Sequence, residues 1–179
     1  MKRAIGYAAM LLLGMSIALA QKPVQRQTLV LNLDYAKFRN NDSSGYLEIY
    51  YGFYPSLITY GQRDGQQMGV LKVRTRVRDE RSGLFQVNNV STVLFPAPDT
   101  SGALSRIVSI SQAGHVVPFG DYRLDVFVVD SLSPTRSDSI SLPFLVRGYG
   151  AQPAISDLEL CSSVKSSARK EDLYYKNSL

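Results

Sequence analysis

The chain has 179 residues, of which 45% are apolar and 20% charged, and it contains one His, one Cys and no Trp. Its formal net charge of +5 is too small an excess to indicate a nucleic-acid-binding surface. A single His and a single Cys cannot supply the three or four ligands of a standard zinc site, and one Cys cannot form a disulfide within the chain. We therefore expect no metal, no cofactor and no internal disulfide.

Residues 1–20 have the pattern of a secretory signal peptide. Lys2 and Arg3 precede an apolar run that ends in Ala18 and Ala20, the Ala-x-Ala pattern of a cleavage site. The run is shorter than the roughly 18–20 apolar residues of a membrane span. We expect cleavage after this pattern and export to the periplasm, the cell surface or the medium. The alternative is an uncleaved peptide, which would be the chain's only membrane contact. Cleavage would leave 159 residues and a net charge of +3, because it removes two basic residues and no acidic one.

The rest of the chain alternates apolar and polar residues with period two, which predicts β-strands. Strands are expected at 28–38, 46–54, 68–78, 84–95, 104–112, 122–130 and 139–146, with a short continuation at 57–60 before a turn at 61–65. Turn-forming residues separate the strands, and no helical periodicity lies between them. This pattern favours an antiparallel sandwich over a parallel α/β sheet.

The penultimate predicted strand is the most informative one. A Pro/Gly turn at 117–120 leads to Tyr122, which opens a long alternating strand. In immunoglobulin-like sandwiches a Tyr at this place folds its hydroxyl back onto upstream backbone, in the tyrosine corner. Pro143 in the next strand lacks a ladder donor and predicts an edge strand, which could accept a strand from a partner. The sequence therefore predicts an immunoglobulin-like antiparallel β-sandwich of about seven strands over residues 24–147.

Residues 148–179 differ in character from the predicted sandwich. A linker is expected at 148–153 and a short strand at 155–160, before a polar Ser- and Lys-rich stretch. Apolar residues return near the end, so we interpret this extension as the start of a further region in a chain that is cut short. Cys161 is expected to be a partly buried thiol in a strand, and the alternative is a bond between two chains.

The sequence offers no catalytic constellation. A Ser-His-Asp mechanism needs a His as its base, and the only one is His115, in residues 112–116 that we interpret as a surface turn. No Gly-x-Ser-x-Gly elbow accompanies it. We predict that the chain is not an enzyme.

Two sets of side chains, each on one face of a predicted strand, are candidate binding surfaces. Tyr46, Tyr50 and Tyr54 share one face of their strand with Glu48, and outward rings would form an aromatic strip able to stack on sugars or on a protein. The alternative is that these rings lie beneath a neighbouring loop or domain. The second set, which we call the basic row, consists of Lys72, Arg74, Arg76 and Arg78. It could meet a negative surface such as lipopolysaccharide, and the alternative is a solvated strand face with carboxylates opposite.

Six segments carry a resemblance to a known family. They read LDYAKF at 33–38, YLEIYYGFYP at 46–55, VRD at 77–79, GDYRL at 120–124, ISDLEL at 155–160 and YYKN at 174–177. In this order they resemble the N-terminal region of exported bacterial GWxTD domain-containing proteins, in which a sandwich module precedes a domain with the Gly-Trp-x-Thr-Asp motif. That motif is absent here, because the chain has no Trp. The resemblance covers about residues 28–179 and implies an exported, multi-domain bacterial protein without implying an activity.

These features together predict a non-enzymatic interaction or structural module of the bacterial envelope. Its expected partner is another protein or a following domain, and not a nucleic acid. One alternative is a carbohydrate-binding module that uses Tyr46, Tyr50 and Tyr54. Another is an accessory domain of an exported hydrolase. Fold alone does not choose among these functions.

Overall fold

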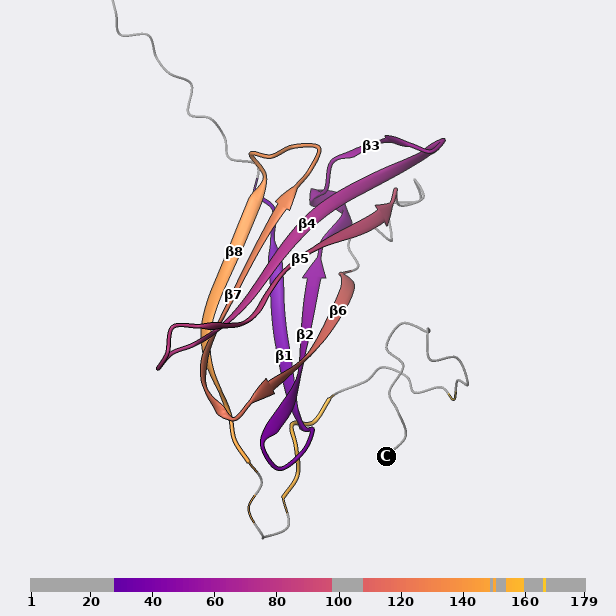
Figure 1. Ribbon diagram of the computed structural model, residues 1–179. Helices are drawn as coiled ribbons and strands as arrows, with labels where there is room; N and C mark the ends of the chain where they lie inside the picture. Colours follow the sequence, from indigo (N-terminus) through magenta and orange to yellow (C-terminus); the bar gives the residue numbers. More distant parts are fainter. Residues whose placement is uncertain (1–27, 98–107, 149, 151–153, 160–165, 167–179) are drawn as a thin grey trace, which may run out of the picture.

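The computed structural model describes residues 28–97, 108–148, 150, 154–159 and 166, which form eight β-strands and one short 3-10 helix (Figure 1). In chain order the elements are β1 (Leu31–Arg39), β2 (Ser44–Phe53), η1 (Pro55–Leu57), β3 (Tyr60–Arg63), β4 (Gln66–Asp79), β5 (Phe85–Pro96), β6 (Ser109–Pro118), β7 (Gly120–Asp130) and β8 (Ser137–Val146). The predicted signal peptide at 1–20, Cys161 and the end of the chain from 167 lie outside the described residues. In the described part, no helix is long and apolar enough to cross a membrane.

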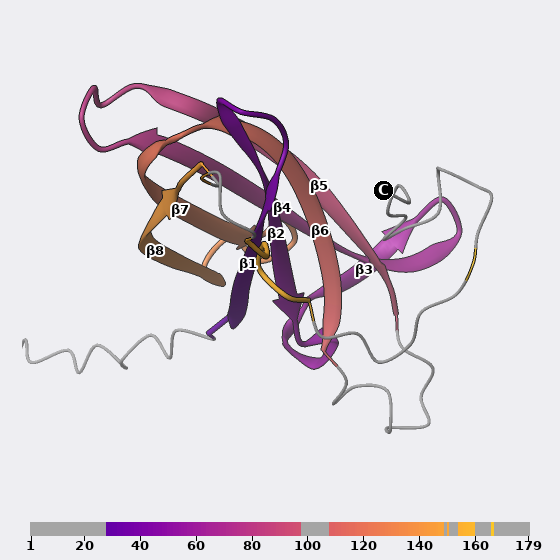
Figure 2. The same ribbon diagram turned by 90° about the horizontal axis from the view of Figure 1, so that it is seen from below.

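The strands form two antiparallel sheets packed face to face. Sheet A has the order β1-β2-β6, and sheet B has the order β3-β4-β7-β8. In sheet B, β3 and β7 pair with successive parts of one edge of β4, and β5 pairs with its opposite edge. At the two margins of the sandwich, β1 contacts β8 and β5 contacts β6 (Figure 2). If β3 is set aside and the other strands are lettered A to G, the sheets are A-B-E and D-C-F-G. Immunoglobulin constant domains have A-B-E-D and C-F-G, so this fold differs by moving the fourth strand to the other sheet. The predicted β-sandwich is confirmed.

Alternating residues of both sheets fill the core. In β4, Leu71, Val73 and Val77 are at most 1% exposed, whereas the basic row lies on the opposite face. The fully buried apolar residues also include Leu47, Ile49, Phe53, Val117, Leu124, Val126 and Val128. Thr75 shares the inner face of β4, and its hydroxyl is 2.8 Å from that of the buried Tyr51. Burial of one face of each strand explains why period-two alternation predicted this fold.

The predicted tyrosine corner is present at the start of β7. Tyr122 is 1% exposed, and its hydroxyl donates a hydrogen bond to the Pro118 carbonyl oxygen at 3.0 Å. Its ring stacks on Phe144 of β8, with a centroid distance of 5.5 Å and an interplanar angle of 29°. The corner fixes the end of β6 to the two strands that follow it. Pro143 lies in β8, at the edge of sheet B, as predicted.

A buried carboxylate stabilises the other end of β7. Asp130 is 0% exposed. Its Oδ2 accepts the Thr59 N–H at 2.7 Å, and its Oδ1 accepts the N–H groups of Leu132 and Ser133 at 2.9 and 3.2 Å. A buried charge is tolerated only when it is hydrogen-bonded in this way. Asp130 therefore holds the β7–β8 loop and the segment before β3 against the core.

The sixth strand does not lie where the sequence predicted it. The prediction placed a strand at 104–112 and a turn at 112–116, but β6 runs from Ser109 to Pro118, and residues 104–107 lie outside the described part. Gly114 is not a turn residue, because it pairs with Glu48 of β2 and the Tyr46 side chain occupies the space of its absent Cβ. His115 is consequently a mid-strand residue, and the turn before β7 is reduced to Phe119.

Two further segments differ from the prediction. Residues 57–60 do not continue a strand: η1 ends at Leu57, and β3 begins at Tyr60 and pairs with β4 across a two-residue turn. That turn is Asp64-Gly65, with φ of 50° and 81°, the left-handed backbone of a type I′ hairpin. The short strand predicted at 155–160 is wrong for the described residues 154–159, which form no strand. Ile155 is 82% exposed and Leu158 is 80% exposed, so no apolar face holds that segment in a sheet.

Candidate functional site

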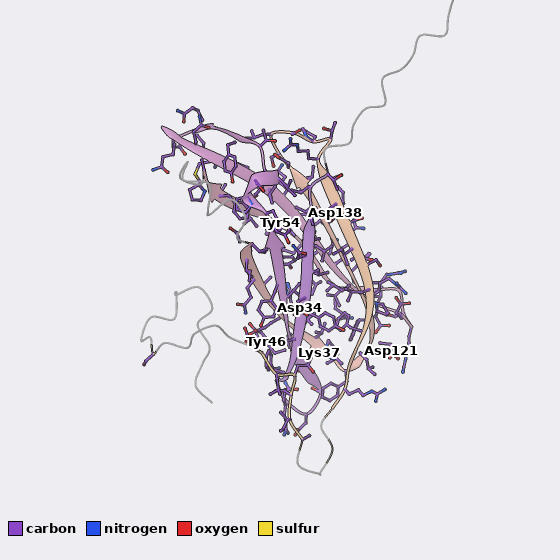
Figure 3. All side chains as sticks on the ribbon, turned by 180° about the vertical axis from the view of Figure 1, so that it is seen from behind. Asp34, Lys37, Tyr46, Tyr54, Asp121 and Asp138 are labelled. Carbon is purple, nitrogen blue, oxygen red and sulfur yellow. The ribbon has the colours of Figure 1, made fainter. Side chains whose placement is uncertain are left out.

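The three candidate tyrosines lie on the outer face of sheet A. The alternate residues of β2, including Leu47 and Phe53, are buried in the core, so Tyr46, Tyr50 and Tyr54 point the other way. All three are half-buried. Figure 3 shows Tyr46, near the start of β2, well apart from Tyr54, which follows the end of that strand. Successive tyrosines are four residues apart, or roughly 13 Å in an extended strand, so their rings do not form a continuous platform.

Tyr50 is engaged by carboxylates rather than free to stack. Its hydroxyl donates a hydrogen bond to Glu48 Oε2, and Glu48 is only 3% exposed. Burial raises the pKa of Tyr50 far above its usual value of 10, and the nearby Glu48 and Glu159 carboxylates raise it further. Glu159 belongs to the segment after the sandwich, which therefore reaches the middle of this face.

Asp157 attaches that segment to the edge of β1. The Lys37 N–H donates to Asp157 Oδ2 at 2.9 Å, and the Asp157 N–H donates to the Lys37 carbonyl at 3.2 Å. The Lys37 ammonium lies 3.6 Å from the same carboxylate. The chain's own residues 154–159 thus partly cover the outer face of sheet A. This placement supports the alternative in which the tyrosines lie beneath a neighbouring segment.

Carboxylates also occupy the free edges of β1 and β8. The N–H groups of Leu31, Tyr35 and Lys37 donate to Asp138, Asp34 and Asp157 at 2.9, 2.8 and 2.9 Å. Figure 3 shows Asp34 and Lys37 on β1, with Asp138 on the neighbouring strand. On β8, the Ser139 N–H donates to Asp138 Oδ1 at 2.8 Å, and Pro143 has no N–H. Blocked edges of this kind disfavour pairing with another strand. Part of the margin predicted to accept a partner's strand is therefore blocked.

The outer face of sheet B has a different character, because the basic row is not neutralised. Its cross-strand neighbours on β7 are Val129, Phe127, Asp125 and Arg123, so only Arg76 has a carboxylate opposite. Asp125 instead accepts a hydrogen bond from the Ser141 hydroxyl at 2.6 Å. Among the described residues, no carboxylate oxygen lies within 4.0 Å of any cation of the row. The sequence left open that carboxylates lie opposite all the cations of the basic row. In the structure this holds only for Arg76 among the four, and Arg76 forms no ion pair with Asp125.

Spacing makes the unneutralised row electrostatically unfavourable. Neighbouring cations are two residues apart, or roughly 6.6 Å along the strand. This distance is less than the Debye length of about 8 Å at physiological ionic strength, so salt screens their repulsion only in part. A bound anion would relieve this repulsion. The row therefore has a physical reason to attract negative groups.

Arg76 has unused hydrogen-bonding capacity. Its guanidinium lies 5.5 Å from the ring centroid of Phe85, which is 48% exposed. Its Nε is buried and has no hydrogen-bond partner among the described residues. A buried donor without a partner costs about 1–3 kcal/mol.

The same face carries exposed apolar side chains beside the cations. Val90 of β5 and Phe127 of β7 flank Arg74 on its two sides and are 55% and 43% exposed. The spacing of its residues on one strand was enough to predict the basic row. Phe127 was not predicted, because the pairing of β7 with β4 is needed to place that ring beside the row.

His115 does not lie on either outer face. It pairs with Leu47 on the inner side of sheet A, and its Nε2 is buried without a partner among the described residues. Burial lowers its pKa from the usual 6.5, because the charged imidazolium would be desolvated. The described residues place no nucleophile or carboxylate in hydrogen-bond contact with this imidazole.

No protein-family model matches the chain, and no curated protein matches it. Among solved structures, the chain is similar to the X-ray structure of target SoR45 of the Northeast Structural Genomics Consortium. The alignment covers 73% of this chain and 95% of that one, with 13% identity and a TM-score of 0.37. A similarity at this level does not identify a function.

Proposed function

We propose that this chain is a non-enzymatic interaction module of the bacterial envelope, and that it makes contact through the outer face of β4, β7 and β8. The observation that carries the proposal is the basic row, whose four cations have no ion-pair partner among the described residues. The face of sheet A is partly covered by residues 154–159, and the edges of β1 and β8 hold bound carboxylates. Within the described part of the chain, the sheet B face combines unpaired cations with the exposed apolar side chains of Val90 and Phe127.

Export is part of this proposal. The pattern at 1–20 supports removal of a signal peptide, and the resemblance to the N-terminal region of GWxTD domain-containing proteins supports an envelope location. Expression of the full chain in a bacterium, followed by fractionation and mass measurement, tests this part. We expect a species that begins at Gln21 outside the cytoplasm. A cytoplasmic protein that retains Met1 would contradict it.

Charge reversal tests the proposed contact face. We expect the chain to sediment with isolated bacterial envelopes at low salt, and Arg74→Glu/Arg76→Glu to reduce this association by about tenfold or more. Long-range attraction between charged surfaces is weakened by salt, so raising the ionic strength should have the same effect on the wild type. The matched control is Arg39→Glu/Arg63→Glu, which changes net charge equally at exposed residues beside Asp42 and Asp64. Equal losses in both variants, or no loss in the first, would contradict the proposal.

A further inference from the structure

A hollow of about 400 Å³ lies on the proposed contact face, within the usual size range of small-ligand pockets. Its polar and aromatic lining comes from three adjacent strands: Arg74 and Arg76 on β4, Asp125 and Phe127 on β7, and Ser139 and Ser141 on β8. These three strands lie side by side in Figure 1.

Strand register arranges the lining as two parallel rows. Arg74, Phe127 and Ser139 are cross-strand neighbours in one row. In the next row Arg76, Asp125 and Ser141 are neighbours in the same order. Two strand spacings, or roughly 10 Å, separate the two arginines from the two serines. The hollow therefore has a cationic side, a hydroxyl side, and a ring and a carboxylate between them.

The arginines, the phenylalanine ring and the carboxylate of the hollow each favour a different chemical group on a ligand. A guanidinium binds a carboxylate through two parallel hydrogen bonds, and no carboxylate oxygen of the described residues lies within 4.0 Å of Arg74 or Arg76. Phe127, 43% exposed, offers a flat apolar surface. Asp125 uses Oδ1 to accept the Ser141 hydroxyl and can accept further donors, whereas it repels a densely charged anion. A matching ligand carries a carboxylate, a ring with an apolar face and hydroxyl groups on one small scaffold.

We propose that this hollow binds a carboxylated sugar, with its carboxylate at Arg74 and Arg76, its ring over Phe127 and its hydroxyls at Asp125 and Ser141. This inference rests on the proposed function, since it names the ligand class of the same face. It assigns sugar recognition to sheet B, whereas Tyr46, Tyr50 and Tyr54 on sheet A were only an alternative sugar-binding site in the sequence.

Titration of the full chain with oligomers of galacturonate and mannuronate tests the ligand class. Calorimetry should show binding of these acids, and none of their neutral methyl esters or of tetraglutamate. Arg74→Gln and Phe127→Ala should each weaken binding by about tenfold, because each removes one of the main contacts. The matched control Arg63→Gln, at an exposed arginine 3.8 Å from Asp64, should bind as the wild type does. Melting curves verify that each variant is folded.

Other results would contradict the ligand class, the binding site or the proposed function separately. If tetraglutamate binds as well as the sugar acids, the sugar assignment is wrong and the anionic contact face stands. If no sugar acid binds while envelope association still depends on Arg74 and Arg76, the ligand class alone is wrong. If the acids bind equally to wild type and Arg74→Gln, the hollow is not their site. If envelope association does not depend on these arginines either, the proposed function fails as well.

Discussion

Removing one hydroxyl group tests the tyrosine corner that identifies this sandwich. Tyr122→Phe deletes the hydrogen bond to the Pro118 carbonyl, which measures 3.0 Å, and leaves the ring in place. The ring is 1% exposed and stacked on Phe144, so neither its burial nor its aromatic contact should change. The free energy of unfolding should therefore report the hydrogen bond alone.

The structure sets the size of the expected loss. A neutral hydrogen bond contributes about 0.5–1.5 kcal/mol net, and a buried acceptor left unpaired adds a further penalty. Pro118 is exposed and the hydrogen bond is only partly buried, so this penalty should be small. We expect a loss of about 1 kcal/mol. For a domain of this size, that loss lowers the melting temperature by about 4 °C.

Urea denaturation followed by circular dichroism measures this loss, and Tyr35→Phe is the matched control. The Tyr35 ring also lies 5.5 Å from Phe144, but within the described part of the chain its hydroxyl has no hydrogen-bond partner. The control should lose less than about 0.5 kcal/mol, as is usual for substitutions that remove no specific interaction. Equal losses in the two variants would show that the corner hydrogen bond does not stabilise this fold. An altered m-value would show that the change is not confined to it.

Three further predictions concern buried groups. His115 should titrate below 6.5 by NMR, and a midpoint at or above 6.5 would refute this prediction. Because the unfolded chain then binds the proton first, the free energy of unfolding should fall as the pH drops through 6.5. His115→Gln should abolish this pH dependence above about pH 5.5. Asp130→Ala should lower the free energy of unfolding, measured by urea denaturation, by about 3 kcal/mol or more, because three backbone donors at 2.7, 2.9 and 3.2 Å lose their acceptor. A loss below about 1 kcal/mol would show that this carboxylate does not stabilise the fold. Gly69→Ala should lower the free energy of unfolding by about 1–3 kcal/mol, because the added methyl would lie 2.5 Å from Ile58 Cγ2. The control Gly150→Ala, with open space around it, should be neutral, and equal melting temperatures of the two variants would exclude the clash.

Much of the fold could be predicted because one face of each strand is buried. In β4 the alternation of Leu71, Val73 and Val77 with cations follows directly from this burial. The tyrosine corner was predictable because a turn, a Tyr and a long alternating strand follow one another in sequence. The hairpin at Asp64-Gly65 was also open to prediction, since Asp-Gly is a strong signal for a two-residue turn.

Other features depend on contacts between distant segments. The prediction of a turn around Gly114 failed because nothing local in the sequence shows that the Tyr46 side chain occupies the space beside that glycine. The covering of Tyr50 depends on Glu159, more than one hundred positions away in sequence. The hollow likewise depends on register, which places Phe127 and Ser139 beside Arg74. Spacing along one strand gave only the cationic side of the site.

Site-specific photo-crosslinking in living cells tests most directly which face of this module makes contact. A photoreactive phenylalanine analogue would replace Phe127 on the basic face or, in a separate variant, Tyr46 on the outer face of sheet A. Both positions are partly exposed, so either can react with a bound partner. We predict envelope adducts from the Phe127 position that disappear in the Arg74→Glu/Arg76→Glu background, and none from the Tyr46 position. Adducts from Tyr46 alone would contradict the account.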